Sequence, residues 1–417
     1  MTLSCFELGE QMLSVNEASA ALATLIERTT GMESVPLTQA HGRRLATDIA
    51  APINVPQNTN AAMDGVALAW EAGETNQQHW PIAGDAFAGK AFEGQVPPGQ
   101  CVRITTGAPL PAGTDTVIMR EQLSEQADTA TVAIPERVQR GQHVRQAGED
   151  IVAGSIALAK GTRLDATCLG LIASLGYAEV PVCKRPRVAI FSTGNEVTPP
   201  GEPLPTAGIY DTNRFTLLGL LSEQGAGVLD LGILPDHQSA IEAALTEASS
   251  SSDLVITTGG VSVGHADFTR AALEQLGQLA FWRVALRPGR PMACGLLGSS
   301  RTPFVGLPGN PVAVMVTFRQ FVVPLLQCLQ GIPPAQPQRL TAIAETALKS
   351  RLKRTDFLRG VYRCDEHGVL HVRSTGAQGS GILTSMVAAN CLIELGDDQE
   401  GAQPGEVVCI QPLTEWQ

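Results

Sequence analysis

The stretch DLVITTGGVSVGHADFT, residues 253–269, guides the interpretation of the whole chain. It begins with apolar, mostly β-branched residues at 254–256, which are typical of a buried strand. The adjacent glycines Gly259 and Gly260 follow, and they let a ligand approach the backbone closely. A helical pattern opens after Asp267. A strand, a glycine-rich loop and a helix start indicate an anion site, because free amides point into such a loop. A plain strand-to-helix turn is the alternative, since neither a dinucleotide fingerprint nor a P-loop is present.

The residues on either side of this stretch alternate between strand and helix patterns. Predicted strands lie at 188–191, 228–234, 281–286 and 304–306, and predicted helices lie between them. This alternation predicts a parallel, doubly wound sheet, in which ligands bind beyond the carboxyl ends of the strands. Those ends carry STGNE, LPD, TTGGVSVG and GLPGN. In the last of these, Asn310 suits a helix N-cap and Pro311 suits the first helical position.

The remaining chain predicts further domains. Residues 11–30 predict an amphipathic helix, capped by Ser14 or Asn16, and proline and glycine recur through a β-rich region with strands at 102–104, 116–119 and 130–134. After a linker at 331–334, period-two alternation predicts a small barrel or sandwich. The predicted domains are 1–51 with 146–184 (a discontinuous helical and β linker domain), 52–145 (an inserted β domain), 185–330 (the α/β domain) and 335–417 (a C-terminal β barrel).

Composition restricts the class of protein. A chain of 417 residues exceeds one ordinary core, and a hydrophobic fraction of 44% argues against disorder. The net charge of −12 disfavours nucleic acid as a partner. The nine cysteines show no metal spacing and are interpreted as reduced thiols, so we expect a cytoplasmic protein. Glu7 and Glu10 in place of a basic leader argue against a signal peptide, and no stretch approaches the length of a membrane span, so no membrane role is expected.

Charged residues near the loops indicate phosphate or oxyanion chemistry. Carboxylates beside amide-rich loops suit Mg²⁺ bound together with substrate phosphates. The candidates in the α/β region are Glu196, Asp211, Asp236 and Asp267. A basic run contains Arg283, Arg287 and Arg290, which either bind an oxyanion or form a solvated strand end. Turn formation and solvent exposure are the plain alternatives for Asp64, Thr106 and Asp150.

At these motifs the chain resembles a known family. The segments NAAMDGVAL, ITTGAP, AGEDI, STGNEV, YDTN, TTGGVSVGHADFT, RPGRP and GLPGNP are similar, in this order, to those of the molybdopterin molybdenumtransferase family (MoeA and the gephyrin E domain). The resemblance implies the four domains above and a homodimer. In that homodimer the cleft lies between the α/β and barrel domains of one subunit and the inserted domain of the other. It also implies a reaction in which adenylyl-molybdopterin and molybdate give molybdenum cofactor and AMP, with Mg²⁺.

The resemblance assigns roles to individual residues by position. It implies catalytic roles for Asp64, Thr106, Glu196 and Asp267, and a metal site at Asp150 and Asp267. Asp236 is implied in the pterin-phosphate pocket. Arg283, Arg287, Arg354 and Ser380 are implied to hold molybdate. The complete substrate-binding set is Gly259, Gly260, Ser262, Asp236, Arg283, Arg287, Pro308, Pro311, Arg354 and Ser380.

The chain also departs from the family pattern. Arg287 replaces the usual lysine, which keeps the charge and changes its geometry. Asn195 and His265 stand where acids are common, and Ala377 and Gly381 flank Ser380 where bulkier residues often occur. Two other functions stay open: a molybdopterin adenylyltransferase, whose sequence resembles the α/β region alone, and a non-catalytic pterin-binding scaffold. Molybdopterin adenylyltransferase and other molybdenum cofactor proteins are the expected protein partners.

Overall fold

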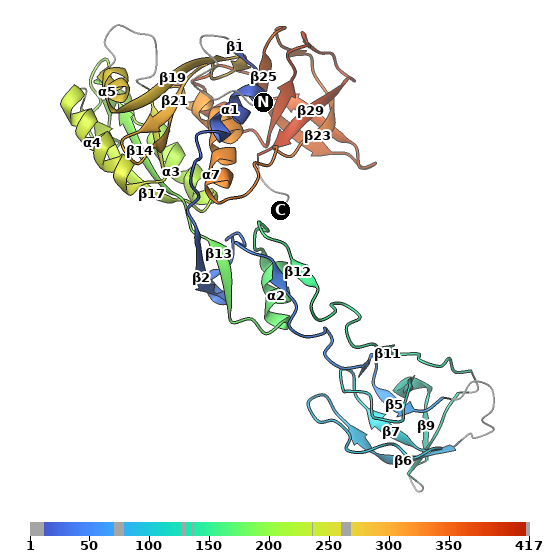
Figure 1. Ribbon diagram of the computed structural model, residues 1–417. Coiled ribbons are helices and arrows are strands. Elements are labelled where there is room, and N and C mark those ends of the chain that lie inside the picture. Colours follow the sequence, from blue (N-terminus) through green and yellow to red (C-terminus); the bar gives the residue numbers. More distant parts are fainter. Residues whose placement is uncertain are drawn as a thin grey trace. The chain divides into compact units, whose positions relative to one another are not determined.

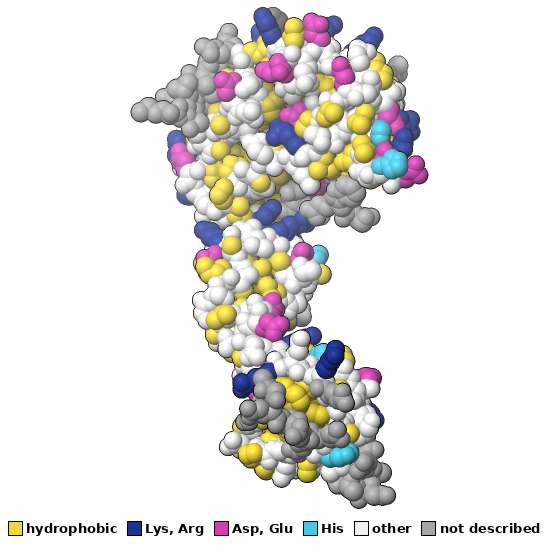
Figure 2. Space-filling model, turned by 90° about the vertical axis from the view of Figure 1, so that its right-hand side faces the viewer, with side chains coloured by type: hydrophobic (Ala, Val, Ile, Leu, Met, Phe, Trp, Pro, Cys, Tyr) yellow, Lys and Arg dark blue, Asp and Glu magenta, His cyan; other side chains and the backbone are white. Residues whose placement is uncertain are grey.

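The structure, a computed structural model, describes residues 12–70, 79–126, 130–135, 137–235, 237–259 and 268–413. The chain forms two compact units (Figure 1). Unit 1 comprises Met1–Glu33 and Cys183–Gln417, and unit 2 comprises Ser34–Val182. On the face shown in Figure 2, basic, acidic and hydrophobic side chains are interspersed over both units. The division into four domains stays a prediction.

Unit 1 contains a seven-stranded sheet in the order β1-β19-β21-β22-β18-β14-β17. The strands β17, β14, β18 and β22 are parallel, as predicted. The prediction of an all-parallel sheet was wrong at the other side, because β21 is antiparallel to both β22 and β19. The bounds are β1 Met12–Leu13, β14 Arg187–Thr193, β17 Gly227–Leu234, β18 Leu254–Thr258, β19 Gly277–Val284, β21 Pro291–Leu297 and β22 Thr302–Leu307.

Alternate residues of these strands face two different helical layers, as the period of two in a strand requires. Val188 and Ile190 of β14 pack in one core with helices α3 and α7, whereas Ala189 and Phe191 pack in a second core with α4 and α5. Figure 1 shows α4 and α5 together on one side of the sheet. The doubly wound α/β fold is therefore confirmed. The helices are α3 Asn213–Glu223, α4 Gln238–Ser251, α5 Phe268–Leu276, α6 Pro311–Thr317 and α7 Val323–Leu329.

The α6–α7 segment corrects one sequence expectation. The helix Pro311–Leu329 is long and apolar enough to cross a membrane, but 72% of its apolar window is buried inside the protein. It is therefore best explained as a core helix. A π-helical segment, η3 (Phe318–Val322), joins α6 to α7. Pro324 follows it and has no amide to donate to Gln320, which accounts for the widened turn.

The N-terminal helix is shorter than predicted. Helix α1 spans Val15–Ala23, and Ser14 caps it in a reciprocal capping box with Glu17. Of the two predicted caps, Ser14 is thus the correct one. Helix α1 contacts α7, and β1 extends the sheet of unit 1 beside β19. The first described residues therefore help to complete the core of unit 1.

The C-terminal part of unit 1 is a closed five-stranded barrel. Its strands pair in the order β25-β26-β23-β29-β27, and β27 pairs back to β25. This confirms the barrel prediction. Short elements accompany it: β20 Leu286–Arg287, β24 Leu348–Lys349, α8 Leu383–Val387 and β28 Gly401–Ala402. The barrel strands are β23 Leu340–Ala344, β25 Thr355–Cys364, β26 Leu370–Ser374, β27 Cys391–Leu395 and β29 Val407–Pro412.

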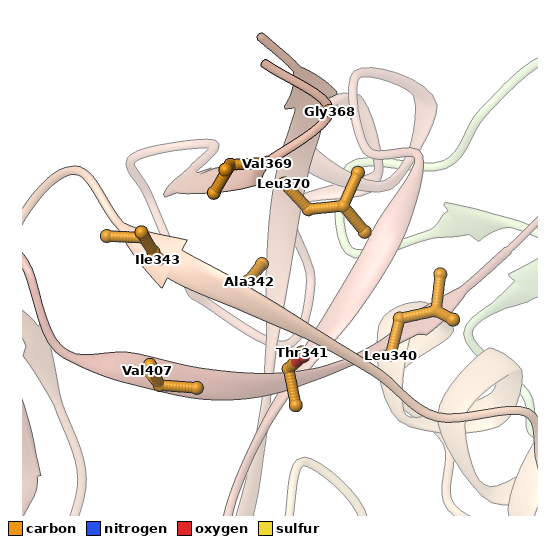
Figure 3. Close-up of a pocket in the computed structure, with 8 residues that line it drawn as sticks. All are labelled: Leu340, Thr341, Ala342, Ile343, Gly368, Val369, Leu370 and Val407. Carbon is orange, nitrogen blue, oxygen red and sulfur yellow. The ribbon is translucent and has the colours of Figure 1, made fainter.

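One hollow of about 480 Å³ lies on the barrel wall, where β23 and β26 diverge (Figure 3). Aliphatic side chains dominate its lining, and Thr341 supplies the one polar side chain among its lining residues. It offers no charged group among these residues. The lining of this hollow is therefore poorly suited to binding an anion or a metal ion.

Unit 2 contains a six-stranded β sheet and a linker made of short paired strands and a helix. The sheet has the order β8-β5-β7-β6-β10-β9, which confirms the predicted strands at 102–104 and 116–119 and places the third at Thr131–Ala133. In the linker, β3 pairs with β12, β2 pairs with β13, and α2 (Ala166–Ser174) packs beside them. The other strands are β2 Met32–Pro36, β3 Ile49–Ala50, β4 Asn60–Ala61, β5 Gly65–Leu68, β6 His79–Ala86, β7 Cys101–Ile104, β8 Thr116–Met119, β9 Ser124–Gln126, β11 Val144–Arg145, β12 Ile156–Leu158 and β13 Glu179–Cys183.

Candidate active site

Three loops meet at the carboxyl edge of the parallel strands. A Cβ on Gly259 would lie 3.6 Å from the carbonyl oxygen of Thr193, and one on Gly309 would lie 3.8 Å from Cα of Gly259. The ends of β14, β18 and β22 thus lie close together, as predicted for this edge. Gly259 has φ +82°, a conformation that favours glycine. Gly259 is half-buried, and its amide donates to the carbonyl of Leu307 at 3.3 Å.

The loop after β14 also places a carboxylate here. Gly194 has φ +132°, and a Cβ on it would lie 2.8 Å from both carboxylate oxygens of Glu196. Only a glycine at 194 leaves Glu196 in this position. After β22, Asn310 and Pro311 occupy the predicted N-cap and first helical positions of α6, with Pro308 just before them. The side chain of Asn310 makes no capping hydrogen bond, and the amide of Asn213 instead donates to the carbonyl of Gly309 at 2.8 Å.

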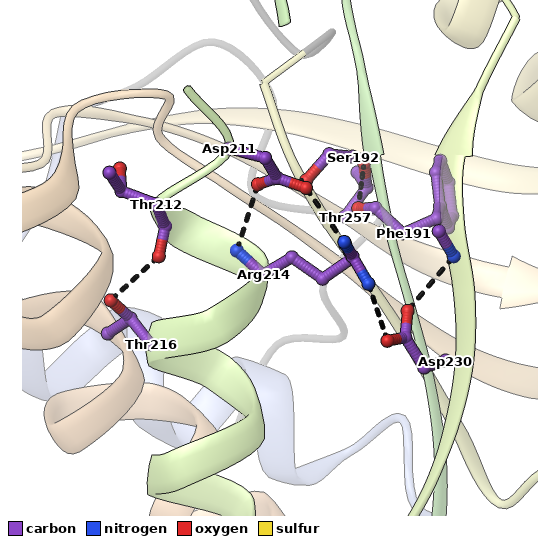
Figure 4. Close-up of polar contacts among 9 residues, drawn as sticks. Phe191, Ser192, Asp211, Thr212, Arg214, Thr216, Asp230 and Thr257 are labelled. Atoms are coloured by element: carbon purple, nitrogen blue, oxygen red, sulfur yellow. Dashed lines mark hydrogen bonds and ion pairs between the residues drawn. The ribbon is translucent and has the colours of Figure 1, made fainter. Parts of the chain in front are cut away.

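Asp211 has a structural environment that sequence reasoning did not predict (Figure 4). Its carboxylate is buried, with 3% exposure, and accepts hydrogen bonds from Ser192 at 3.0 Å and from Nε of Arg214 at 2.8 Å. Arg214 reaches Asp230 with its other end, at 2.5 Å. A carboxylate with these partners is satisfied within the protein. Asp211 is therefore a structural acid and no longer a candidate metal ligand.

The barrel supplies a buried cation that the sequence analysis missed. Arg359 on β25 is 1% exposed, and its guanidinium donates to Ser385 Oγ at 2.9 Å and to the carbonyls of Ala377 and Gly379 at 3.1 and 2.9 Å. Burial, and secondarily the charge of Arg287, lower its pKa to about 10, so it stays charged at neutral pH. The three groups that accept these hydrogen bonds from Arg359 are uncharged. The sequence offered one sign of this buried cation, because Arg359 lies within a run of strand residues that are buried.

Arg359 thereby fixes the loop that contains Ser380. The carbonyl of Ser380 accepts a hydrogen bond from the amide of Val312 at 3.0 Å, and α6 contacts α8. The predicted barrel residue Ser380 is therefore joined to the first turn of α6, beside the predicted residues Pro308 and Pro311. This contact joins the barrel to the carboxyl edge of the sheet.

The remaining predicted arginines differ in their surroundings. Arg354 donates from Nη2 to Asp356 Oδ2 at 3.1 Å, and its Nε lies 2.8 Å from Oδ1 of the same buried carboxylate. Arg287, on β20, is 46% exposed and lies 3.7 Å from Asp356. Strand β20 pairs with β25, so Arg287 and Arg359 come from neighbouring strands. Arg283 and Arg290 are exposed.

Asp64 and Thr106 of unit 2 form a contact, as the resemblance implied for one site. Asp64 Oδ1 accepts hydrogen bonds from both the amide and the hydroxyl of Thr106, each at 2.7 Å. These bonds hold the pKa of Asp64 below its ordinary value. Asp150, also in unit 2, is exposed.

Four predicted residues, Asp236, Gly260, Ser262 and Asp267, lie outside the described residues, as does His265. Over the described ranges no group of three or more His, Cys, Asp or Glu side chains forms a metal cluster. The metal assignment at Asp150 and Asp267 therefore stays a prediction.

Comparison with known proteins covers almost the whole chain. Three family profiles match in sequence order: "MoeA N-terminal region (domain I and II)" at residues 13–176, "Probable molybdopterin binding domain" at 189–328, and "MoeA C-terminal region (domain IV)" at 341–413.

Individual relatives agree with these profiles. The chain is 43% identical to molybdopterin molybdenumtransferase of Haemophilus influenzae, over 96% of this chain and 99% of that protein. It is 34% identical to molybdopterin molybdenumtransferase 2 of Mycobacterium tuberculosis, over 97% and 100% of the two chains. Its fold matches the crystal structure of the molybdopterin biosynthesis moeA protein of Pyrococcus horikoshii with a TM-score of 0.81, at 30% identity, over 96% and 100%.

Proposed function

Because the chain belongs to the molybdopterin molybdenumtransferase family, transferases of molybdenum cofactor biosynthesis, we propose that it inserts molybdenum from molybdate into adenylyl-molybdopterin. In this reaction water cleaves the phosphoanhydride bond and AMP leaves. The two dithiolene sulfurs bind molybdenum, and one molybdate oxygen leaves as water with the two thiol protons. The products are molybdenum cofactor and AMP.

The buried charge of Arg359 is the observation that best supports an anionic substrate. Molybdate is a tetrahedral dianion, and such anions bind where cations and hydroxyls converge. Arg359 carries its charge at 1% exposure among neutral partners, and Arg287 adds a second positive charge from the adjacent strand. We propose that Arg287, Arg359 and Ser380 hold molybdate, with Arg359 also fixing the Ser380 loop. By family resemblance, Arg283 and Arg354, the latter paired with Asp356, are proposed to bind molybdate as well.

The carboxyl edge of the sheet is proposed to hold the pterin and its phosphate. The loops near Thr193, Gly259 and Gly309 lie close together at this edge, and glycine-rich loops beside a sheet are a common place to bind a phosphate. Pro308 and Pro311 border this edge. Asp236, Gly260, Ser262 and Arg283 remain proposals by family resemblance.

Mg²⁺ fits the donors at this edge only in part. It needs one or two carboxylates together with substrate phosphates and waters. Of the described acids there, Asp211 is committed to Arg214 and Glu196 faces Gly194. By family resemblance we propose that Asp150 and Asp267 hold the ion. When bound, Mg²⁺ would neutralise charge on the phosphoanhydride.

The assembly and setting are also proposals. We propose a homodimer in which Asp64 and Thr106 of one subunit serve the cleft of the other. The net charge of −12 supports the absence of a nucleic-acid partner, and the burial of helix Pro311–Leu329 supports the absence of a membrane anchor in that helix. A cytoplasmic location, with molybdopterin adenylyltransferase and other cofactor proteins as partners, completes the proposal.

The two alternatives receive less support. An adenylyltransferase resembling the α/β region alone would need neither the barrel cation nor unit 2. A non-catalytic scaffold would not need Thr106 to hold Asp64 at 2.7 Å.

AMP release from adenylyl-molybdopterin, measured with and without molybdate and Mg²⁺, tests the proposal. We expect release that depends on both, together with active cofactor. Asp267→Asn should retain pterin binding and lose AMP release. Tight binding of adenylyl-molybdopterin without any release by the wild-type protein would instead establish the scaffold.

A further inference from the structure

A hollow in unit 2 adjoins the Asp64–Thr106 contact and is not explained by that contact. It has a volume of about 270 Å³. Its lining combines an aromatic ring, two arginines and a carboxylate, and forming the turn does not require these side chains. Its lining is Asp64, Gly65, Val66, Phe87, Arg103, Ile104, Thr105, Arg120 and Leu123.

Phe87 offers an exposed ring on a rigid turn. It is 46% exposed, although burying such a side chain would be favourable. Its backbone exchanges two hydrogen bonds of 2.9 Å with Lys90, and Gly89 between them has φ +82°. The amide of Ala88 also donates to Thr105 Oγ1 at 3.1 Å. The turn is therefore held in place without the ring being buried.

The turn and the Asp64 contact are joined through neighbouring residues. Thr105 holds the turn of Phe87, and Thr106 holds Asp64. Gly65 lets the strands approach, because a Cβ there would lie 1.8 Å from the carbonyl oxygen of Ile118. An aromatic platform and a carboxylate are thus positioned by the same segment, which favours binding because little ordering remains to be done.

Two arginines give the hollow a positive side. Arg103 lies 3.9 Å from Asp85, at the long limit of an ion pair, and both side chains are about half exposed. Arg120 follows β8 and, after the bonds from Thr106, contributes to lowering the pKa of Asp64. Arginine binds phosphate through paired N–H donors.

We propose that this hollow binds a planar heteroaromatic ring that carries a phosphate, with the ring stacked on Phe87 and the phosphate on Arg103 and Arg120. The inference rests on the proposed function, because adenylyl-molybdopterin contains two such groups, adenylate and pterin phosphate. Phe87, Arg103 and Arg120 are then specificity residues for that substrate, presented by unit 2.

Titration calorimetry of the full-length protein tests this site, with AMP in one arm and a pterin monophosphate in the other. Stacking on an aromatic side chain contributes about 1–3 kcal/mol per base, a factor of about 5 to 150. We therefore expect Phe87→Ala, Arg103→Ala and Arg120→Ala each to weaken one of the two ligands by about tenfold. The ligand whose affinity falls shows whether the hollow binds the adenylate or the pterin phosphate. If AMP is the affected ligand, adenosine, which lacks phosphate, should distinguish Phe87→Ala from the arginine variants, because only Phe87→Ala should weaken it.

Matched controls come from the same unit. Arg140→Ala removes an exposed arginine that pairs with Asp115, and Val152→Ala removes an exposed apolar side chain; neither lines the hollow. Both should leave the two affinities unchanged. Circular dichroism melting verifies that each variant is folded.

Unchanged affinities for both ligands in all three folded variants would overturn the inference. So would a loss of the oligomeric state in Phe87→Ala, measured by light scattering, since the ring would then belong to a subunit interface. Cofactor formation by the wild-type protein is measured in parallel. If the wild type makes cofactor and the variants keep wild-type KM values, this inference fails while the proposed function stands.

Discussion

The amide of Val312 donates a hydrogen bond of 3.0 Å to the carbonyl oxygen of Ser380. Val312 lies in the first turn of α6, directly after the loop that ends β22, and Ser380 lies in the barrel loop held by Arg359. This hydrogen bond joins the barrel loop to the edge of the sheet where the pterin is proposed to bind.

Arg359→Ala should raise the molybdate concentration needed for half-maximal AMP release by about tenfold or more, because a charge-assisted contact contributes about 1.5–3 kcal/mol. It should also lower the free energy of unfolding by about 2–4 kcal/mol, since three acceptors lose their donor. Molybdate titration and urea unfolding measure the two effects. Arg363→Ala, in an exposed pair on the same strand, is the control and should change stability by less than about 1 kcal/mol. A wild-type molybdate titration in Arg359→Ala would exclude its role in anion binding.

Arg214→Ala should destabilise the protein by about 3–5 kcal/mol, because it leaves the buried carboxylate of Asp211 without its cation. The change is measured as a shift of the urea unfolding midpoint. Arg301→Ala breaks the exposed pair with Glu27 and should shift the midpoint far less, because exposed ion pairs contribute little to stability. Equal midpoints for the two variants would contradict the assignment of Asp211 as a structural acid.

Glu394 should make stability depend on pH in the acid range. Burial raises its pKa, but hydrogen bonds from Arg339 and Gln411 outweigh burial, so its pKa is lowered overall. A lowered pKa in the folded state contributes stability that is complete well above the unfolded value of about 4.3 and is lost as the pH falls through the folded pKa.

The melting temperature of wild type should therefore exceed that of Glu394→Gln at pH 7, and the difference should shrink toward pH 3. Gln411 also accepts from Gln320 of η3 at 2.8 Å, so Glu394 is linked through Gln411 to the α/β part of unit 1. A difference in melting temperature that stays constant from pH 7 to 3 would refute this account.

The cysteines should react very unequally with iodoacetamide at pH 8. Burial raises the pKa of Cys101 and Cys391 to about 12, which leaves almost no thiolate, whereas Cys364 is exposed. Peptide mass spectrometry of briefly labelled native protein should show modification at Cys364 and none at the other two. Early labelling of Cys391 would mean that the barrel opens readily.

Much of the fold could be predicted because local patterns matched the tertiary structure. Strands β14, β17, β18 and β22 are apolar runs that end in glycine or proline loops, and the sheet places those ends together. Strand β21 was missed because its partner β19 pairs with it in antiparallel fashion, which a strand–helix alternation does not indicate.

The site was less predictable for a physical reason. Arg354 and Arg359 lie five positions apart, beside and on strand β25. Arg354 pairs with Asp356, whereas Arg359 has neutral partners, and this difference depends on tertiary packing that the sequence does not show. The same holds for Asp211, whose commitment to Arg214 depends on where α3 packs. Family resemblance indicated Arg354, whereas the geometry adds Arg359.

The pairing of Met12 with Arg283 has a consequence for synthesis on the ribosome. Strand β1 is made first, but its partner β19 emerges only after all of unit 2, which lies between them in the chain. Unit 2 is contiguous and can fold as soon as Val182 has emerged, because domains generally fold as units. Until β19 has been made, the apolar face of α1 has no core to pack against. Unit 1 therefore completes its sheet only after unit 2 has been made, and removal of residues 1–23 should affect its solubility more than a cut within unit 2.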